Sequence, residues 1–186
     1  MSALILIGPD GSGKSTLLAE YARRGYTTAD VDHAVACSLG VPVADLFTTV
    51  APAQRIELTA AIVRDLFDDI RREPQTLFIL ALPADYVDIP DVVAQFVTLK
   101  NDADLTVVVV EAGVSALMTR LGLYGPRVTN IVLPRKELKA QLEKRLPLYY
   151  QHADHRVDTT HESRENMACD VADGVIMLIN PPASRS

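Results

Sequence analysis

Short apolar runs alternate along the chain with longer segments in which apolar residues recur every three or four positions. The short runs are typical of buried strands and the longer segments of amphipathic helices. Five runs are expected to form strands: residues 3–7, 27–29, 76–82, 105–110 and 156–158. Helices are expected between them, at residues 14–24, 31–39, 42–47, 52–72, 90–99, 114–121, 135–150 and 162–179. The alternation predicts an α/β fold with a five-stranded parallel sheet and helices on both faces.

Length and composition fit one globular domain over residues 1–186. The chain is 48% hydrophobic and 23% charged, which is an ordinary balance for a protein with a packed core. Its formal net charge of −6 argues against nucleic acid as the main partner, because binding a phosphate backbone requires a basic surface. We expect a small molecule as the partner and favour a monomer.

The sequence also indicates a compartment. No apolar run approaches the ~20 residues that a membrane span needs, so no membrane association is expected. The chain begins with a strand rather than with the charged segment and cleavage site of a secretion signal, which favours a cytoplasmic protein. Cys37 and Cys169 lie far apart in apolar stretches, and we expect them to be buried free thiols.

The most specific motif stands between the first strand and the first helix, at residues 8–16 (GPDGSGKST). It satisfies every fixed position of the P-loop pattern G-x-x-x-x-G-K-[ST]. A strand, a glycine-rich turn and a helix N-terminus form an anion cradle, because free backbone N–H groups and the helix dipole converge on one spot. Lys14 is expected to reach the β- and γ-phosphates of ATP, and Ser15 to ligate Mg²⁺. The expected nucleotide-binding residues of the loop are Gly8, Gly11, Ser12, Gly13, Lys14, Ser15 and Thr16.

A second cue is a pair of carboxylates, Asp30 and Asp32, at the end of the second expected strand. Side chains one residue apart on an extended segment point to opposite sides. One carboxylate can therefore join the Mg²⁺ shell while the other accepts the proton of a hydroxyl that attacks the γ-phosphate. The same residues could instead form a solvated turn in which an aspartate caps the next helix.

Three arginines supply a third cue. Arg120 precedes the glycine- and proline-containing stretch at residues 122–134, Arg127 lies within it, and Arg145 follows on a helix. The stretch is expected to be a mobile loop. An arginine on a closing loop can stabilise a transferring phosphoryl group, whereas one on a fixed helix suits a substrate carboxylate. Taken singly, each could also be a solvated surface residue.

Together these pieces resemble the shikimate kinases, which belong to the P-loop group that includes the nucleoside monophosphate kinases. Residues 30–32 (DVD) are similar to the family's D-x-D, residues 144–149 (KRLPLY) to its R-x-P-L-Y, and residues 156–159 to the strand that follows. The separation of Arg120 from Arg127 also matches the family pattern. The resemblance covers most of the chain and implies a three-layer P-loop kinase with a mobile lid at approximately residues 120–134.

The resemblance implies a kinase that transfers the γ-phosphoryl group of Mg·ATP to a hydroxyl of a small, carboxylated acceptor such as shikimate. On the nucleotide side it places Asp30 in the Mg²⁺ shell. It also implies that Arg120 flanks adenine and that Arg127 closes over the phosphates as a catalytic residue together with Lys14.

On the acceptor side, the resemblance makes Asp32 the residue that binds the acceptor hydroxyl and acts as base. It implies that Arg145 holds the acceptor carboxylate. Arg55 matches the family's other carboxylate-binding arginine if one residue is deleted before it.

The acceptor half departs from the family pattern. Shikimate kinases carry a glycine triplet after the third strand, where this chain has residues 80–83 (LALP). The nearest polar residues that could replace the lost contacts are Asp85, Tyr86 and Asp88. This departure leaves open a non-catalytic or regulatory nucleotide-binding protein built on the same fold.

A nucleoside monophosphate kinase is a further alternative. Residues 8–11 (GPDG) are closer to the thymidylate kinases than to the shikimate kinases. The chain lacks, however, the Asp-Arg-Tyr/Phe/His segment that would follow a third strand in that group.

Overall fold

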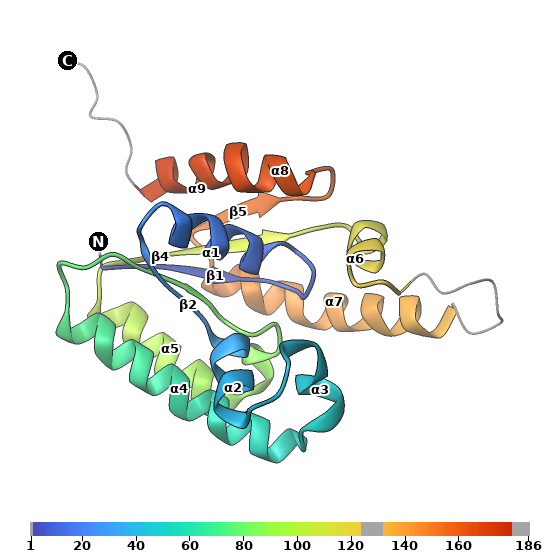
Figure 1. Ribbon diagram of the computed structural model, residues 1–186, viewed down its shortest axis with the longest axis horizontal. Helices are drawn as coiled ribbons and strands as arrows, with labels where there is room; N and C mark the ends of the chain where they lie inside the picture. Colours follow the sequence, from blue (N-terminus) through green and yellow to red (C-terminus); the bar gives the residue numbers. More distant parts are fainter. Residues whose placement is uncertain (1, 124–131, 180–186) are drawn as a thin grey trace.

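The structure is a computed structural model that describes residues 2–123 and 132–179. Its strands are β1 (Ala3–Ile7), β2 (Thr27–Asp30), β3 (Phe78–Ala81), β4 (Leu105–Glu111) and β5 (His155–Asp158). They form one five-stranded sheet in the order β2-β3-β1-β4-β5, and all the neighbouring strands are parallel (Figure 1). The expected parallel sheet is therefore confirmed, although β3 begins two residues later than the apolar run that predicts it.

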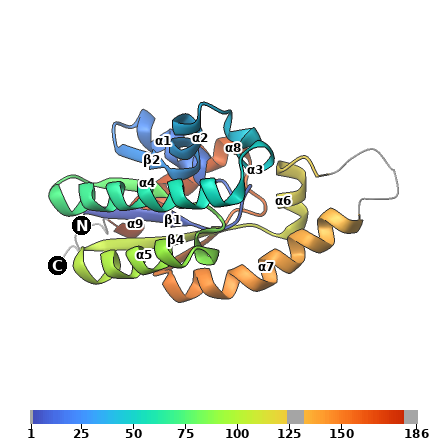
Figure 2. The same cartoon turned by 90° about the horizontal axis from the view of Figure 1, so that it is seen from below.

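Helices cover both faces of the sheet, so that three layers result (Figure 2). One face packs against α1 (Lys14–Arg23) and α9 (Ala172–Ile179). The opposite face packs against α4 (Pro52–Arg72), α5 (Pro90–Asp102) and α7 (Val132–His152).

Strand β1 shows why the sheet must be covered on both sides. Leu4 and Leu6 belong to the apolar cluster with α1 and α9, whereas Ile5 and Ile7 belong to the cluster with α4, α5 and α7. All four side chains are fully buried, because successive residues of a strand face opposite sides of the sheet. Each contributes about 2 kcal/mol by removal from water.

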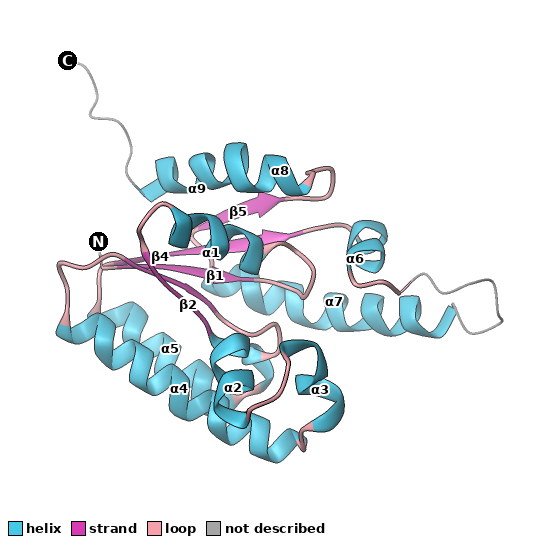
Figure 3. Ribbon diagram, viewed as in Figure 1, coloured by secondary structure: helices cyan, strands magenta, loops and turns pink. Residues whose placement is uncertain are grey.

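The remaining elements are short and are coloured by type in Figure 3. They are α2 (Val31–Leu39), the 3₁₀ turn η1 (Val43–Asp45), α3 (Leu46–Thr49), the 3₁₀ turn η2 (Tyr86–Asp88), α6 (Val114–Arg120), α8 (Arg164–Asn166) and the π-helical turn η3 (Met167–Val171). The single closing helix expected over residues 162–179 is thus divided by a π-helical turn. The loop expected to reach residue 134 ends sooner, because α7 already begins at Val132.

The prediction of buried cysteines is wrong, since Cys37 and Cys169 are both exposed free thiols. Cys37 lies on the outer side of α2, whose buried residues are Val31, Val35 and Ala36. An apolar neighbourhood in sequence does not determine which side of a short helix a residue occupies, and that is why the prediction failed.

Gly8 ends β1 and leads into the P-loop with a φ of +134°. A Cβ at this position would overlap the backbone carbonyl oxygen of Val110 in β4. The backbone fixes the positions of both this Cβ and the carbonyl oxygen, so neither can rotate away. The φ value is also unfavourable for any residue with a side chain. We expect Gly8→Ala to lower the free energy of unfolding by about 3 kcal/mol, measured by urea denaturation.

The matched control is Gly25→Ala. Gly25 also has a positive φ, of +87°, but open space surrounds the position of its missing Cβ. Its replacement should cost only about 1 kcal/mol, which is the backbone contribution alone. Equal losses in the two variants would show that the contact with β4 is unimportant.

Candidate active site

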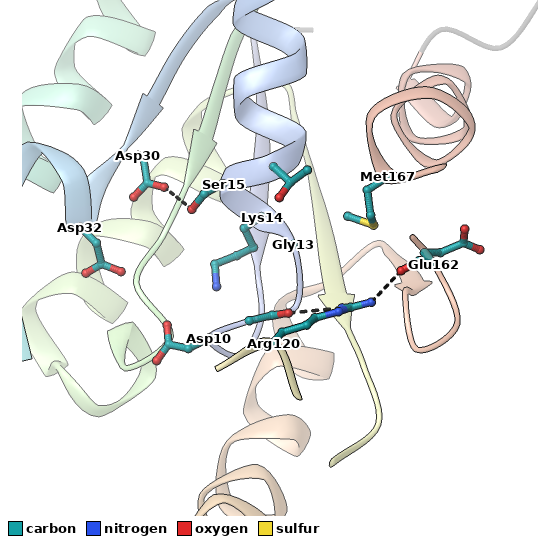
Figure 4. A pocket seen from close by; sticks show the side chains of 11 residues that line it. Asp10, Gly13, Lys14, Ser15, Asp30, Asp32, Arg120, Glu162 and Met167 are labelled. Carbon is teal, nitrogen blue, oxygen red and sulfur yellow. Dashed lines mark hydrogen bonds between the residues drawn. The ribbon is translucent and has the colours of Figure 1, made fainter. Parts of the chain in front are cut away.

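The P-loop, between β1 and α1, forms one wall of a cavity of about 550 Å³ (Figure 4). Across the cavity, the side chain of Met167 in η3 approaches Gly13, where φ is +109°. A Cβ on Gly13 would overlap the methyl group of the flexible Met167 side chain, which would have to move to admit it. Because Gly13 has no side chain, the loop backbone here lines the cavity directly.

Lys14 and Ser12 show that the loop suits a polyphosphate. Lys14 is 7% exposed, and its Nζ donates to the carbonyl oxygens of Gly8 at 2.7 Å and Pro9 at 3.1 Å. The buried Oγ of Ser12 has no hydrogen-bond partner among the described residues. A phosphate oxygen offers an acceptor to both groups, which fits the binding of ATP.

Most of the residues predicted from sequence come together around this cavity. Those that line it are Gly11, Gly13, Lys14, Ser15, Thr16, Asp30, Asp32 and Arg120. Gly8 and Ser12 are buried within the loop, whereas Arg55 and Arg145 do not line this cavity. Arg127 lies outside the described residues, as do residues 124–131 of the expected lid.

Asp30 joins β2 to the P-loop. Its Oδ2 accepts a hydrogen bond from the Ser15 hydroxyl at 2.6 Å, and its Oδ1 accepts one from the backbone N–H of His33 at 3.3 Å. The residue therefore caps α2, as one of the alternatives from the sequence expects, and its carboxylate also faces the phosphate-binding loop.

The Ser15–Asp30 pair fits Mg²⁺. Hydroxyl and carboxylate oxygens are the ligands that this cation prefers, and it usually takes only one or two from the protein and the others from phosphate and water. Within the described ranges, no group of three or more His, Cys, Asp or Glu side chains could hold a metal ion. A cation beside Ser15 would thus be bound together with a phosphate-bearing ligand.

Asp32 lies in the first turn of α2, which begins at Val31 as expected, so Asp30 and Asp32 do not share one extended segment. Figure 4 shows Asp32, Lys14 and Asp10 arranged around one space. The pKa of Asp32 is raised to about 7, mainly by burial. The Asp10 carboxylate adds to this rise and the Lys14 ammonium opposes it, while Asp30 and Asp85 add smaller increases. A carboxyl group that titrates near neutrality is well suited to accept a proton.

Three residues that line the cavity were not predicted: Asp10, Glu162 and Met167. Asp10 occupies a position of the P-loop that the motif leaves free, and a carboxylate in a phosphate-binding loop was the signal that could have identified it. Glu162 and Met167 belong to no motif, so nothing in the local sequence marks them.

Arg120, at the end of α6, forms hydrogen bonds both to the P-loop and to the segment after β5. Its guanidinium donates to the carbonyl oxygen of Gly11 at 3.3 Å, to the Thr159 hydroxyl at 3.0 Å and to the carbonyl oxygens of Thr159 and Glu162. Thr159 is fully buried after β5, and its hydroxyl lies 2.8 Å from the carbonyl oxygen of Ser12. Arg120 therefore fixes the segment after β5 against the P-loop.

Arg55 lies on α4 and pairs with Asp85 in the segment that follows β3. The Arg55 Nη1 to Asp85 Oδ2 distance is 2.6 Å, and the two side chains are 11% and 14% exposed. The guanidinium also stacks on the ring of Phe47, with its carbon 4.5 Å from the ring centroid. Arg55 is thereby held in one position, although it lies outside the cavity wall.

Arg145, on α7, pairs with a second aspartate of the same segment. Its Nε lies 2.8 Å from Asp88 Oδ2, while Lys144 Nζ lies 2.6 Å from Asp88 Oδ1. Burial opposes ionisation of Asp88, but the hydrogen bonds from Lys144 and Arg145 prevail and lower its pKa. Arg145 lines a second cavity of about 200 Å³, which shares Asp10 with the first.

The segment that replaces the family's glycine triplet is fully packed. Leu80, Ala81 and Leu82 are each at most 2% exposed, and residues 80–83 line neither cavity. The hydroxyl of Tyr149 donates to the carbonyl oxygen of Ala84, which holds the chain just after this segment against α7. The backbone here is closed to a ligand by its own side chains.

No helix within residues 2–123 and 132–179 combines the length and the apolar character needed to cross a membrane.

Comparisons with known proteins agree with this geometry. A scan against protein-family models gives no match. A shikimate kinase from Frankia casuarinae is 34% identical over 169 residues, which cover 87% of this chain and 68% of that protein. The structure of shikimate kinase from Acinetobacter baumannii in complex with shikimate superposes with a TM-score of 0.74 at 21% identity, covering 98% of this chain and 95% of that one.

A shikimate kinase structure from Bacteroides thetaiotaomicron gives a TM-score of 0.70 at 17% identity, covering 96% of this chain and 97% of that one. At such identities the solved structures establish the fold alone, and they confirm that it is that of a P-loop kinase. Because the Frankia protein is related at 34% identity over most of both chains, the chain belongs to the shikimate kinase family.

Proposed function

We propose that the protein transfers the γ-phosphoryl group of Mg·ATP to a hydroxyl group of a small acceptor, which is shikimate or a compound of similar size and hydroxylation. The main support is a single cavity in which Lys14 and the Ser15–Asp30 pair lie beside Asp32. These groups supply phosphate binding, cation binding and proton acceptance, which phosphoryl transfer to an alcohol requires. Membership of the shikimate kinase family favours the same reaction.

On the nucleotide side, Lys14 turns from its loop carbonyls to the β- and γ-phosphates. Ser15 and Asp30 hold Mg²⁺, which neutralises phosphate charge when bound. Arg120 flanks the adenine at the cavity wall. Arg127, outside the described residues, closes over the phosphates in this proposal.

On the acceptor side, Asp32 binds the attacking hydroxyl and takes its proton. The raised pKa of Asp32 makes the carboxylate a stronger base than an exposed aspartate, and the proton has a favourable destination as the new O–P bond forms. Arg55 and Arg145 lie beside the segment at residues 83–89, where the acceptor's other end is expected.

A nucleotide-binding protein without kinase activity is the second candidate. The packed segment at residues 80–83 favours it, because the backbone that would wrap the acceptor ring is covered. The position of Asp32 beside Lys14 disfavours it, since a protein that only binds nucleotide has no need of a base there. The cytoplasmic location, the monomeric state, the single domain and the lack of binding to nucleic acid or membrane all stay predictions.

The test is ADP release in the presence of Mg²⁺ and ATP, with shikimate compared against hydroxy acids, polyols and nucleoside monophosphates. We expect at least one shikimate-sized hydroxyl compound to raise the rate about 100-fold or more above the rate with water alone. Tight ATP binding with no stimulation by any acceptor would support the non-catalytic candidate. Stimulation by nucleoside monophosphates alone would support the kinase class indicated by residues 8–11.

A further inference from the structure

Two arginines that a shikimate kinase would offer to a substrate carboxylate are already neutralised in this protein. Arg55 pairs with Asp85 and Arg145 pairs with Asp88, at 2.6 Å and 2.8 Å. Both aspartates belong to the segment from Pro83 to Ile89, which follows the packed residues in place of the family's glycine triplet. This part of the chain therefore lacks the exposed glycine backbone of the family, and it carries two carboxylates that pair with the arginines.

The Arg55–Asp85 pair is not easily exchanged for a pair with a ligand. Both side chains are largely buried, and the guanidinium is also stacked on Phe47. A substrate carboxylate that displaced Asp85 would leave an uncompensated charge in a poorly hydrated place, which is costly. Among the described residues, the second carboxylate oxygen of Asp85 is inaccessible to solvent and has no hydrogen-bond donor.

The Arg145–Asp88 pair is more exposed to solvent, and Asp88 is shared between Arg145 and Lys144. Asp88 lies between Lys144 and Arg145 and engages only the Nε of Arg145. The remaining N–H groups of this guanidinium can still donate to neutral oxygens. Its net attraction for an anion is reduced, because a carboxylate already lies against it.

Asp10 adds negative charge to the same side of the site. It lines both cavities and forms no ion pair with any described residue. Its carboxylate lines the second cavity together with Arg145, so an anion that approached Arg145 through this cavity would meet its repulsion.

We infer that the acceptor is a polyol without a free carboxylate, and that Asp85 and Asp88 exclude acids by neutralising Arg55 and Arg145. The inference rests on the proposed function and narrows its acceptors to those without a carboxylate, which excludes shikimate itself. It therefore departs from the carboxylated acceptor that the family resemblance implies. It assigns the two aspartates a part in specificity: the segment after β3 rejects the charged group that the arginines would otherwise bind.

The experiment compares matched acceptors that differ only in the charged group. Shikimate is paired with its carboxamide, and gluconate with the corresponding hexitol. Binding is measured by calorimetry with Mg²⁺ and a non-hydrolysable ATP analogue, and ADP release is measured in parallel with ATP. In at least one pair, we expect the wild-type protein to bind the neutral member about tenfold more tightly than the acid.

The variant Asp88→Asn keeps the shape of the side chain and removes the charge that neutralises Arg145. The acid should then bind about tenfold more tightly than it binds the wild type, while the affinity for its neutral partner changes less than about threefold. Asp85→Asn should act in the same direction through Arg55, and agreement of the two variants guards against misfolding of one. Asp91→Asn is the charge-matched control, because Asp91 is exposed in the first turn of α5 and forms no ion pair with either arginine.

Tighter binding of the acid than of the neutral member by the wild-type protein would overturn the inference, whatever the turnover. So would an affinity for the acid that stays within about twofold in both Asp88→Asn and Asp85→Asn. Binding of a neutral acceptor without any phosphorylation would contradict the proposed function and leave this inference standing. The two claims can therefore fail separately.

Discussion

Replacement of Asp32 by asparagine is expected to lower kcat about 10³-fold and to leave the affinity for Mg·ATP within about threefold of wild type. The amide has nearly the same shape but cannot take the proton of the attacking hydroxyl. The measurement is steady-state ADP release with the best acceptor, together with calorimetric binding of the ATP analogue. Turnover that stays within about fivefold of wild type would remove Asp32 from the role of base.

The same residue predicts a pH dependence of the reaction. Asp32 acts as a base only when it is ionised, and its pKa is raised to about 7. The value of kcat/KM should therefore rise with pH through the neutral range in the wild-type protein. The residual activity of Asp32→Asn should lack this rise.

Stability should show the opposite trend with pH. The folded-state pKa of Asp32 lies above that of the unfolded chain, about 7 against 3.8, so the native state binds this proton more tightly. The stability contributed by the site is complete below about pH 4, falls as pH rises towards 7 and is level above it. Ionised Asp32 is thus a cost that Asp32→Asn removes.

We expect the stabilisation by Asp32→Asn to be about 2 kcal/mol larger at pH 8 than at pH 5. The measurement is urea unfolding without nucleotide or Mg²⁺, so that no bound ion changes the field at Asp32. Asp91→Asn, at an exposed position, should show no such increase. A pH-independent effect of Asp32→Asn would mean that its carboxyl group titrates normally.

Loss of the P-loop lysine should be nearly as severe. Lys14→Met keeps the apolar stem of the side chain but removes the ammonium, and we expect kcat/KM for ATP to fall about 10³-fold. In the structure Nζ donates to the Gly8 and Pro9 carbonyl oxygens, so the variant also loses two hydrogen bonds within the loop and a modest loss of stability is expected. Turnover, ATP affinity and thermal unfolding are measured for the same preparation.

Lys139→Met is the control for Lys14→Met. Lys139 is exposed on α7, where its Nζ lies 3.6 Å from Glu143, and its removal should leave turnover unchanged. If Lys14→Met bound and turned over ATP like this control, the P-loop would not be the nucleotide site.

The sequence predicted those parts of the fold that local patterns determine. Strand β1 and residues 107–110 of β4 are uninterrupted apolar runs, and such runs are stable only between two layers of helices. The P-loop was predicted because its motif constrains backbone and side chains together. The helix expected at residues 31–39 is confirmed as α2, but placing Asp30 and Asp32 on one extended segment was wrong, because Asp30 ends β2 and Asp32 lies in the helix.

The long-range ion pairs and hydrogen bonds of the site could not be predicted from the sequence. Arg55 and Asp85 are separated by 30 residues, and Arg120 and Thr159 by 39. Contacts of this kind depend on how β-strands and helices are brought together, and no spacing along the chain encodes them. For this reason both arginines of the acceptor side were predicted as ligands. Asp85 and Asp88 were noted as polar residues near the acceptor, but their pairing with these arginines emerged only from the fold.

The most direct test of the account is the fate of the γ-phosphoryl group. The protein is incubated with Mg²⁺, ATP labelled at the γ-phosphorus and the acceptor panel, and the products are separated and identified by mass spectrometry. We predict that the label appears in a phosphate ester of one acceptor, in an amount equal to the ADP formed, and that Asp32→Asn suppresses it. Label found only in ATP or in inorganic phosphate, under conditions in which ATP binds, would contradict a kinase.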